Sequence, residues 1–80
     1  MSQDALREGI IEELVGIAPD TAGSVSDTAH LLDDLGLDSM DFLNLISALQ
    51  KRFGVTIAEV DFHRLINIAA LRNYIADRLV

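Results

Sequence analysis

Three stretches of the chain place apolar residues at helical spacing, and the first of them covers residues 2–18. Its apolar stripe consists of Leu6, Ile10, Ile11, Leu14, Val15 and Ile17. This spacing predicts an amphipathic helix. Ser2 or Asp4 is expected to cap its start. Pro19 is expected to end it, because a proline disfavours the α conformation in the residue before it.

The second helical stretch covers residues 39–53 and reads SMDFLNLISALQKRF. Its apolar positions are Phe42, Leu43, Ile46, Leu49 and Phe53. Lys51 and Arg52 fall in the last turn, where positive charge favours the helix dipole. Gly54 is a natural stop, because glycine adopts the left-handed conformation without steric cost.

The third helical stretch covers residues 67–80, with Asn67 as its expected cap. Its predicted stripe consists of Ile68, Leu71, Ile75 and Leu79. A short helix fits within residues 58–66 and would turn Phe62 and Leu65 inward. The preceding residues 54–57 are too few to build a sheet, so we interpret them as a linker.

A polar segment, residues 19–38, joins the first two helices and shows no sustained periodicity. A connection of this length in a small domain usually has a function of its own. Leu31, Leu32 and Leu35 are expected to anchor it to the core. The pattern as a whole predicts an all-α fold: a small four-helix bundle of three main helices and one short helix, forming a single domain over residues 1–80.

Composition narrows the possible functions. The 80-residue chain is 50% hydrophobic but only 5% aromatic, so aliphatic side chains must supply most of the core. It has no cysteine, which excludes disulfides and thiolate ligands. The net charge of -7 argues against nucleic acid and favours partners with basic docking patches. No segment is long and apolar enough to span a bilayer or resembles a secretion signal, so we expect a cytoplasmic protein.

Acidic residues gather around a lone serine, Ser39, in the segment DDLGLDSMDFLNL. They are Asp33, Asp34, Asp38 and Asp41, with Asp27 upstream. The simplest interpretation is a helix cap made by Asp38 or Ser39. A catalytic serine is disfavoured, because the segment lacks the glycines of a nucleophile elbow and no motif links His30 or His63 to it. The acids also lack the spacing of a calcium loop, so no metal is expected and both histidines are expected at the surface.

The segment DDLGLDSMDFLNLISALQKRFGVTI, together with the length, charge and helix layout, resembles the acyl carrier protein family over nearly the whole chain. Members are small acidic four-helix bundles that carry acyl groups as thioesters on a phosphopantetheine arm. Asp38-Ser39-Met40 takes the place of the family's Asp-Ser-Leu-type triplet. The resemblance implies that Ser39 receives 4′-phosphopantetheine from coenzyme A through a phosphopantetheinyl transferase, and that the protein is a carrier in fatty acid, polyketide or related biosynthesis, not an enzyme.

Ser39 is also well placed for such a group on physical grounds. A phosphodiester at a helix N-terminus is electrostatically favoured. At about 100° per residue, Ser39 lies above the apolar stripe of its helix. We expect an acyl pocket lined by Phe42, Leu43, Ile46, Leu49, Ile57, Phe62, Leu65, Ile68 and Leu71. We expect partners, including the transferase and acyl-loading enzymes with basic patches, to recognise Asp33, Asp34, Leu37, Asp38, Met40, Asp41 and Asn44.

Two departures from the family pattern carry further hypotheses. The second helix does not continue acidic along its exposed side, where Asn44, Ser47, Gln50, Lys51 and Arg52 stand. We therefore expect a specialised carrier with a dedicated ligase or synthase.

Phe42 stands where many relatives carry a small or polar residue. It is either a larger core residue or a gate that limits the length of the cargo.

Several alternatives remain open from the sequence. The Asp-Ser-Met triplet also occurs in aminoacyl or D-alanyl carriers, and a peptidyl carrier shares the same chemistry. The chain could be a carrier domain of a larger synthase, although Met1 and the lack of flanking linkers favour a stand-alone, monomeric protein. A helical interaction module without a covalent arm is the alternative from a different class.

Overall fold

The computed structural model describes residues 2–21, 23 and 25–79, and the regular elements in the described part are all helices, without strands. Its elements are α1 (Gln3–Ile17), the 3₁₀ helix η1 (Pro19–Thr21), α2 (Ser39–Phe53), the 3₁₀ helix η2 (Glu59–Arg64) and α3 (Ile68–Arg78). The three main helices and the short one, η2, confirm the predicted fold class. None of the described helices combines the length and apolar character needed to span a bilayer.

The helix ends follow the signals in the sequence. The Ser2 side chain accepts a hydrogen bond from the amide of Ala5 (3.1 Å), and Asn67 accepts one from Ala70 (2.8 Å). Gly54 ends α2 in the left-handed conformation with φ 66°, which a side chain would strain. Pro19 begins η1, a 3₁₀ turn that the sequence pattern did not predict.

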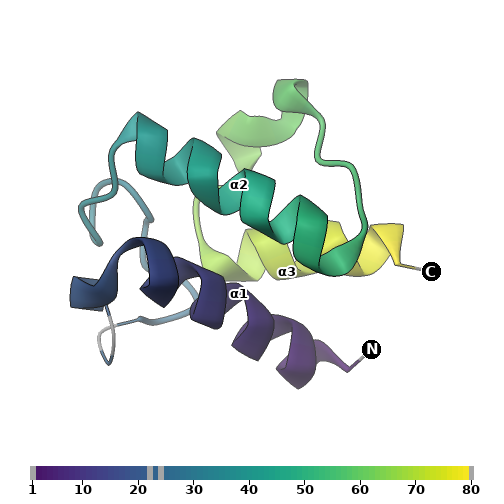
Figure 1. Cartoon of the computed structure of the whole chain (residues 1–80), viewed down its shortest axis with the longest axis horizontal. Helices are drawn as coiled ribbons and strands as arrows, with labels where there is room; N and C mark the ends of the chain where they lie inside the picture. Colours follow the sequence, from purple (N-terminus) through teal and green to yellow (C-terminus); the bar gives the residue numbers. More distant parts are fainter. Residues whose placement is uncertain (1, 22, 24, 80) are drawn as a thin grey trace.

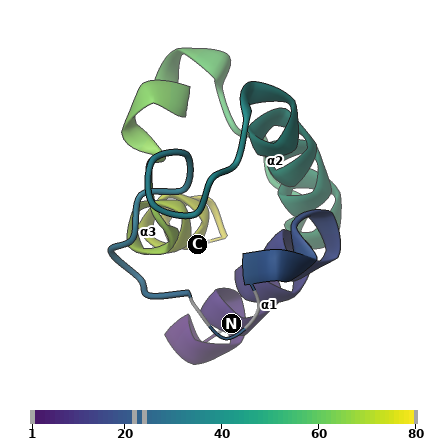
Figure 2. The same cartoon turned by 90° about the vertical axis from the view of Figure 1, so that its left-hand side faces the viewer.

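Helix α1 lies against both of the other main helices and runs antiparallel to α2 (Figure 1). The view turned by 90° shows η2 standing apart from α1, on the far side of α2 and α3 (Figure 2). At Gly9, α1 approaches α2 so closely that an added Cβ atom would lie 2.7 Å from Cζ of Phe53. The buried core consists of Leu6, Ile10, Leu14, Leu31, Leu37, Leu45, Ile46, Leu49, Ile57, Leu65, Ile68, Leu71, Tyr74 and Ile75.

Two parts of the predicted apolar stripes were wrong. Leu79 follows the last residue of α3 and is 39% exposed, because the helix ends at Arg78 before this side chain can pack. In α2, Leu45 is fully buried although the predicted stripe left it out, whereas Leu43 is 46% exposed. The buried face of α2 is turned toward α1, and Leu45 rather than Leu43 lies on that face.

The long connection before α2 is fixed to the rest of the fold by its backbone. The amide of Leu31 donates to the carbonyl of Ile66 (2.8 Å), and Leu37 donates back to Leu31 (3.2 Å). Leu31 is fully buried as predicted, while Leu32 and Leu35 are partly buried against the core. These contacts hold the entrance to α2 next to the segment between η2 and α3.

Asp27 ties the same connection to two helices. Its carboxylate accepts hydrogen bonds from Arg7 of α1 and from Arg72 of α3, the latter at 3.0 Å. The hydrogen bond from Arg7 is the largest cause that lowers the pKa of Asp27, and the charges of Arg7 and Arg72 lower it further. Asp27 therefore belongs to the scaffold and is not a free member of the acidic group around Ser39.

We expect the Asp27 contacts to lose their stabilising effect in acid. The pKa of Asp27 in the folded protein lies below its unfolded value of about 3.9. Its contribution to the free energy of unfolding is therefore complete above that unfolded value, and it disappears as the pH falls through the folded pKa. Asp27→Asn should therefore flatten the fall of the free energy of unfolding with decreasing pH, measured by urea titrations between about pH 6 and 2. Asp20→Asn, at an exposed aspartate of η1, is the matched control, and an equal flattening in both variants would contradict the assignment.

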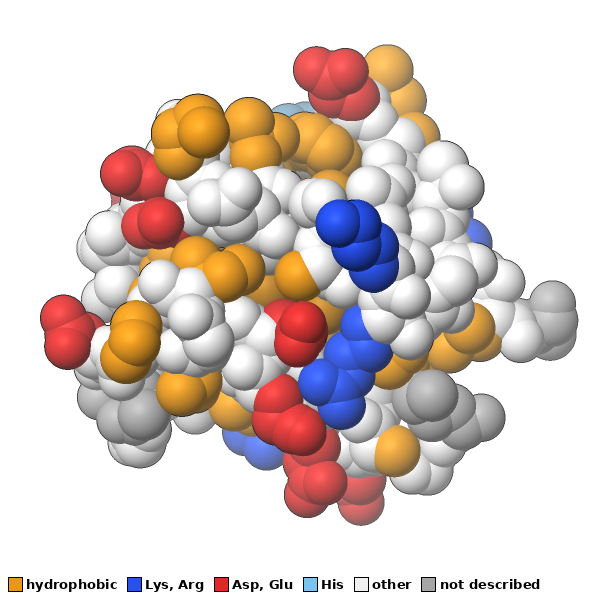
Figure 3. All heavy atoms as spheres, in the orientation of Figure 1, with side chains coloured by type: hydrophobic (Ala, Val, Ile, Leu, Met, Phe, Trp, Pro, Cys, Tyr) orange, Lys and Arg blue, Asp and Glu red, His pale blue; other side chains and the backbone are white. Residues whose placement is uncertain are grey.

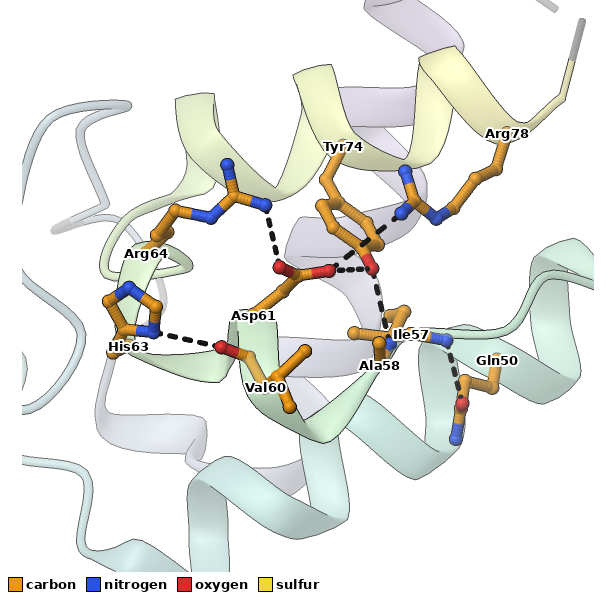
Figure 4. Close-up of polar contacts among 9 residues, drawn as sticks. All are labelled: Gln50, Ile57, Ala58, Val60, Asp61, His63, Arg64, Tyr74 and Arg78. Carbon is orange, nitrogen blue, oxygen red and sulfur yellow. Dashed lines mark hydrogen bonds and ion pairs between the residues drawn. The ribbon is translucent and has the colours of Figure 1, made fainter.

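Helix η2 is fixed to α3 by polar contacts around Asp61 (Figure 4). The Tyr74 hydroxyl donates to Asp61 (2.7 Å) and accepts from the amide of Ala58 (3.1 Å). Arg78 of α3 stacks 3.4 Å above the Tyr74 ring and lies 3.8 Å from Asp61, while Arg64, within η2 itself, donates to the other carboxylate oxygen of Asp61 (2.7 Å). The hydrogen bond from Tyr74, followed by that from Arg64, lowers the pKa of Asp61. This network holds η2 in place beside the cavity described next.

Candidate functional site

The start of α2 is capped without the help of Ser39. Asp38 is the N-cap, and its carboxylate accepts a hydrogen bond from the amide of Asp41 (2.8 Å). The Asp41 side chain in turn accepts from the amide of Asp38 (3.4 Å), which completes a capping box. Ser39 is the first residue of the helix and is exposed. Of the two caps that the sequence allowed, the structure shows Asp38, and the Ser39 hydroxyl is left free for chemistry.

Ser39 stands beside an apolar cavity of about 340 Å³. The lining residues come from the loop before α2, from the first turns of α2, and from η2 and the residues after it. They are His30, Leu32, Ser39, Phe42, Leu43, Phe62, His63, Leu65 and Ile66. Because Ser39, Leu43 and Ile66 are also exposed, the cavity reaches the surface where Ser39 lies.

Two phenylalanines form the boundary between α2 and η2 in this cavity. The rings of Phe42 and Phe62 pack edge to face, with centroids 5.6 Å apart and an angle of 77° between the planes. Both side chains are partly buried and contact the core. Phe42 therefore joins α2 to η2 and also lines the cavity with Ser39. Its role as a gate on cargo length stays a prediction.

The two histidines lie on the same cavity, which the sequence did not reveal. Nδ1 of His30 accepts from the amides of Leu32 (3.2 Å) and Asp33 (3.1 Å). Nδ1 of His63 lies 3.0 Å from the carbonyl oxygen of Val60, to which it donates (Figure 4). His63 is exposed as predicted, whereas His30 is only partly exposed. No spacing in the sequence could have linked them to Ser39, because only the folded loop brings His30 alongside η2.

The structure divides the residues predicted to line an acyl pocket into two groups. Phe42, Leu43, Phe62 and Leu65 line the cavity beside Ser39. The other members belong to the buried core and do not line it; they are Ile46, Leu49, Ile57, Ile68 and Leu71. Sequence reasoning missed Leu32 and Ile66, which come from irregular segments where no periodicity marks an inward position.

The residues predicted to contact partners surround the start of α2, with one exception. Asp41 is partly exposed, and the exposed members are Asp33, Asp34, Asp38, Met40 and Asn44. Asp34 also accepts a hydrogen bond from the amide of His30 (2.8 Å), which fixes the loop locally. Leu37 is 5% exposed and packs in the core, so it lies beneath this surface.

Large apolar side chains are exposed on α2 and η2 and just after η2. Leu43 (46%) and Ile66 (41%) line the cavity, and Met40 (64%) and Val60 (79%) lie on α2 and η2. In the space-filling view, hydrophobic atoms gather along the edge that carries the first half of α2 and η2, with acidic atoms nearby (Figure 3). The surface next to Ser39 thus combines apolar contacts with negative charge.

The second half of α2 presents a different surface. Arg52 pairs with Glu12 (3.3 Å) and Glu13 (3.4 Å) of α1, and Lys51 is exposed. In Figure 3, basic and acidic atoms lie next to one another where the end of α2 passes α1. On α2, negative charge is therefore confined to the first turn, next to Ser39, and does not continue along the helix.

Known proteins resemble this chain over most of its length. A family model described as a phosphopantetheine attachment site matches residues 8–75. An acyl carrier protein of Campylobacter fetus is 35% identical over 72 residues, covering 90% of this chain and 88% of the relative. One of Thermotoga maritima is 30% identical over 79 residues, covering 94% and 98%. The solution structure of a protein from Anaplasma phagocytophilum, assigned as an acyl carrier protein, has a TM-score of 0.84 at 29% identity, covering 96% of this chain and 91% of that one.

Proposed function

Because the chain belongs to the acyl carrier protein family, whose members bear a 4′-phosphopantetheine group, we propose that Ser39 is the residue to which this group is attached. The whole chain then forms one carrier domain. It holds acyl groups as thioesters and passes them between enzymes without catalysing a reaction itself. The observation that carries the proposal is the free, exposed Ser39 hydroxyl at the start of α2, beside an apolar cavity.

The residues around Ser39 suit the chemistry of the group. The attached arm supplies a thiol on which an acyl group is held as a thioester. Ser39 is the first residue of a 15-residue helix, where the backbone dipole favours the negative charge of a phosphodiester. Phe42, Leu43 and Phe62 offer an apolar surface within the adjacent cavity. The side chains therefore provide an attachment point, favourable electrostatics and a shelter from water in one place.

The surface around Ser39 supports docking to enzymes with basic patches. Asp33, Asp34 and Asp38 are exposed, and such charges mainly raise the rate of encounter with a positively charged partner. Met40, 64% exposed, adds a flexible apolar contact next to Ser39. The phosphopantetheinyl transferase and the acyl-loading enzymes are the partners that this surface is proposed to serve.

The mixed charge of the second half of α2 supports a specialised carrier. Arg52 pairs with Glu12 and Glu13 there, and Lys51 adds a further positive charge. An enzyme that docks along an entirely acidic helix would lose attraction at this end. We therefore propose a dedicated ligase or synthase as the main partner, with acyl rather than aminoacyl cargo, in keeping with the relatives named acyl carrier proteins.

One experiment in two stages tests the proposal. The protein is incubated with coenzyme A and a broad-specificity phosphopantetheinyl transferase, and its intact mass should increase by one phosphopantetheine group. An unchanged mass would favour the interaction module without a covalent arm and would contradict the carrier function. In the second stage, the modified protein is acylated and offered to a ketosynthase of general fatty acid synthesis. Slow elongation is expected, and elongation at the full rate would contradict a dedicated partner.

A further inference from the structure

The cavity beside Ser39 is unusually rich in ring side chains for this chain. The sequence contains three phenylalanines, one tyrosine and two histidines. Two of the phenylalanines and both histidines line this one cavity, together with aliphatic residues. The aliphatic side chains that dominate the rest of the core would suffice to shelter a saturated chain. The rings concentrate planar, polarisable surface next to the proposed attachment point.

These rings are held in fixed positions before any cargo arrives. Phe42 and Phe62 hold each other edge to face. The imidazole of His30 is anchored by two backbone amides, and that of His63 by the carbonyl of Val60. Aromatic groups prefer edge-to-face or offset packing on other rings, and side chains held in advance lose little entropy on binding. The cavity is thus prepared for a planar group more than for a flexible one.

The volume of the cavity indicates how large a group it can shelter. An apolar protein cavity of about 150 Å³ accommodates a benzene molecule, so about 340 Å³ holds one ring with a short linker. The side chains that would have to separate for a long chain to enter are fully buried and do not line the cavity, such as Leu49, Ile68 and Leu71. A long saturated chain would have to open this core, whereas a short aryl group would not.

We propose that the cavity selects a short acyl group that ends in an aromatic ring, held against the Phe42–Phe62 pair. This inference rests on the proposed attachment of the arm to Ser39. It names the class of cargo, an aryl-substituted acyl thioester, that the carrier shelters best. Phe42 and Phe62 are the residues that set this preference.

Two thioesters with the same number of carbon atoms test the preference. The phosphopantetheinylated protein is prepared with either a phenylpropanoyl or a nonanoyl group, whose carbons next to the thioester are alike. The rate of cleavage by hydroxylamine is measured for each and divided by the rate for the corresponding free acyl-pantetheine. We expect the phenylpropanoyl thioester to be protected about two- to tenfold more than the nonanoyl thioester, from the usual strength of ring–ring contacts.

Leucine substitutions test whether the difference in protection comes from the aromatic rings or from apolar contact in general. Phe42→Leu and Phe62→Leu keep an apolar side chain but remove the ring, so each should abolish the difference between the two thioesters. Phe53→Leu is the matched control, because Phe53 is also partly buried but does not line the cavity. This control should preserve the difference. The NMR signals of the Phe42 and Phe62 rings give a second measure, since the phenyl group should shift them and the nonanoyl group should not.

The outcomes distinguish the inference from the function on which it rests. Equal protection of both thioesters on the unsubstituted protein, or a difference that survives both Phe42→Leu and Phe62→Leu, would overturn the aryl preference while leaving the carrier function intact. If the protein does not accept a phosphopantetheine arm, the mass measurement already fails, and both the carrier function and the aryl preference would be wrong. If circular dichroism shows that one leucine variant folds poorly, the other variant and the NMR signals of the rings still test the aryl preference.

Discussion

Ser39→Ala is expected to abolish attachment of the arm completely while leaving the fold intact. The hydroxyl oxygen of Ser39 is the proposed acceptor, so alanine removes the only atom of that side chain that can be esterified. The helix should persist, because Asp38 and Asp41 form the capping box and alanine is the best helix former. Intact mass after incubation with coenzyme A and the transferase measures attachment, and circular dichroism measures helix content.

Ser47→Ala is the matched control for this result. Ser47 is an exposed serine on the same helix, away from its start, and its substitution should leave the mass increase unchanged. A mass increase that persists in Ser39→Ala would place the arm on another residue. A loss of helix content in Ser39→Ala would instead show that the serine has a structural role that the capping box does not cover.

Leu71→Ala is expected to lower the free energy of unfolding by about 2–5 kcal/mol, the range for removing a fully buried leucine side chain. Small domains have little stability to lose, since their total is near the lower end of about 5–15 kcal/mol. A large fraction of the variant should therefore be unfolded in mild denaturant. Urea titration followed by circular dichroism gives the shift of the midpoint.

Leu79→Ala makes the same chemical change at the other end of the predicted stripe. Because Leu79 is 39% exposed and follows the end of α3, we expect a loss of about 1 kcal/mol or less. Similar losses for the two variants would mean that α3 extends further and packs more evenly than the structure indicates. The comparison thus tests the boundary of the core directly.

The sequence predicted the helices well because their signals are local. The apolar spacing of residues 39–53, the cap at Asn67 and the stop at Gly54 each depend on neighbours in the chain. The edges of the predicted apolar stripes were less accurate. Leu79 and Leu45 were misplaced because the width of a buried face depends on which helices pack against it, and residue spacing contains no such information.

The candidate site was only partly predictable for the same reason. The position of Ser39 follows from a local motif and from the capping residue Asp38 beside it. The cavity depends on a loop, on η2 and on the residues that follow it. His30, Leu32 and Ile66 reach the cavity through backbone hydrogen bonds between distant segments, such as that from Leu31 to Ile66. Such pairings leave no periodic trace in the sequence.

The attachment of η2 is asymmetric, and this asymmetry gives the carrier a preferred direction of movement. Toward α3, η2 is held by the directional hydrogen bond from Tyr74 to Asp61 (2.7 Å), which weakens steeply when its geometry changes, and by the ion pair between Arg78 and Asp61 (3.8 Å). Toward α2, η2 makes the apolar Phe42–Phe62 contact, which contains no hydrogen bond, and Gln50 of α2 accepts a hydrogen bond from the amide of Ile57 just before η2 (2.9 Å). We expect cargo that needs more room to separate η2 from α2 at the Phe42–Phe62 contact, while Asp61 keeps η2 attached to α3, which stays packed against α1.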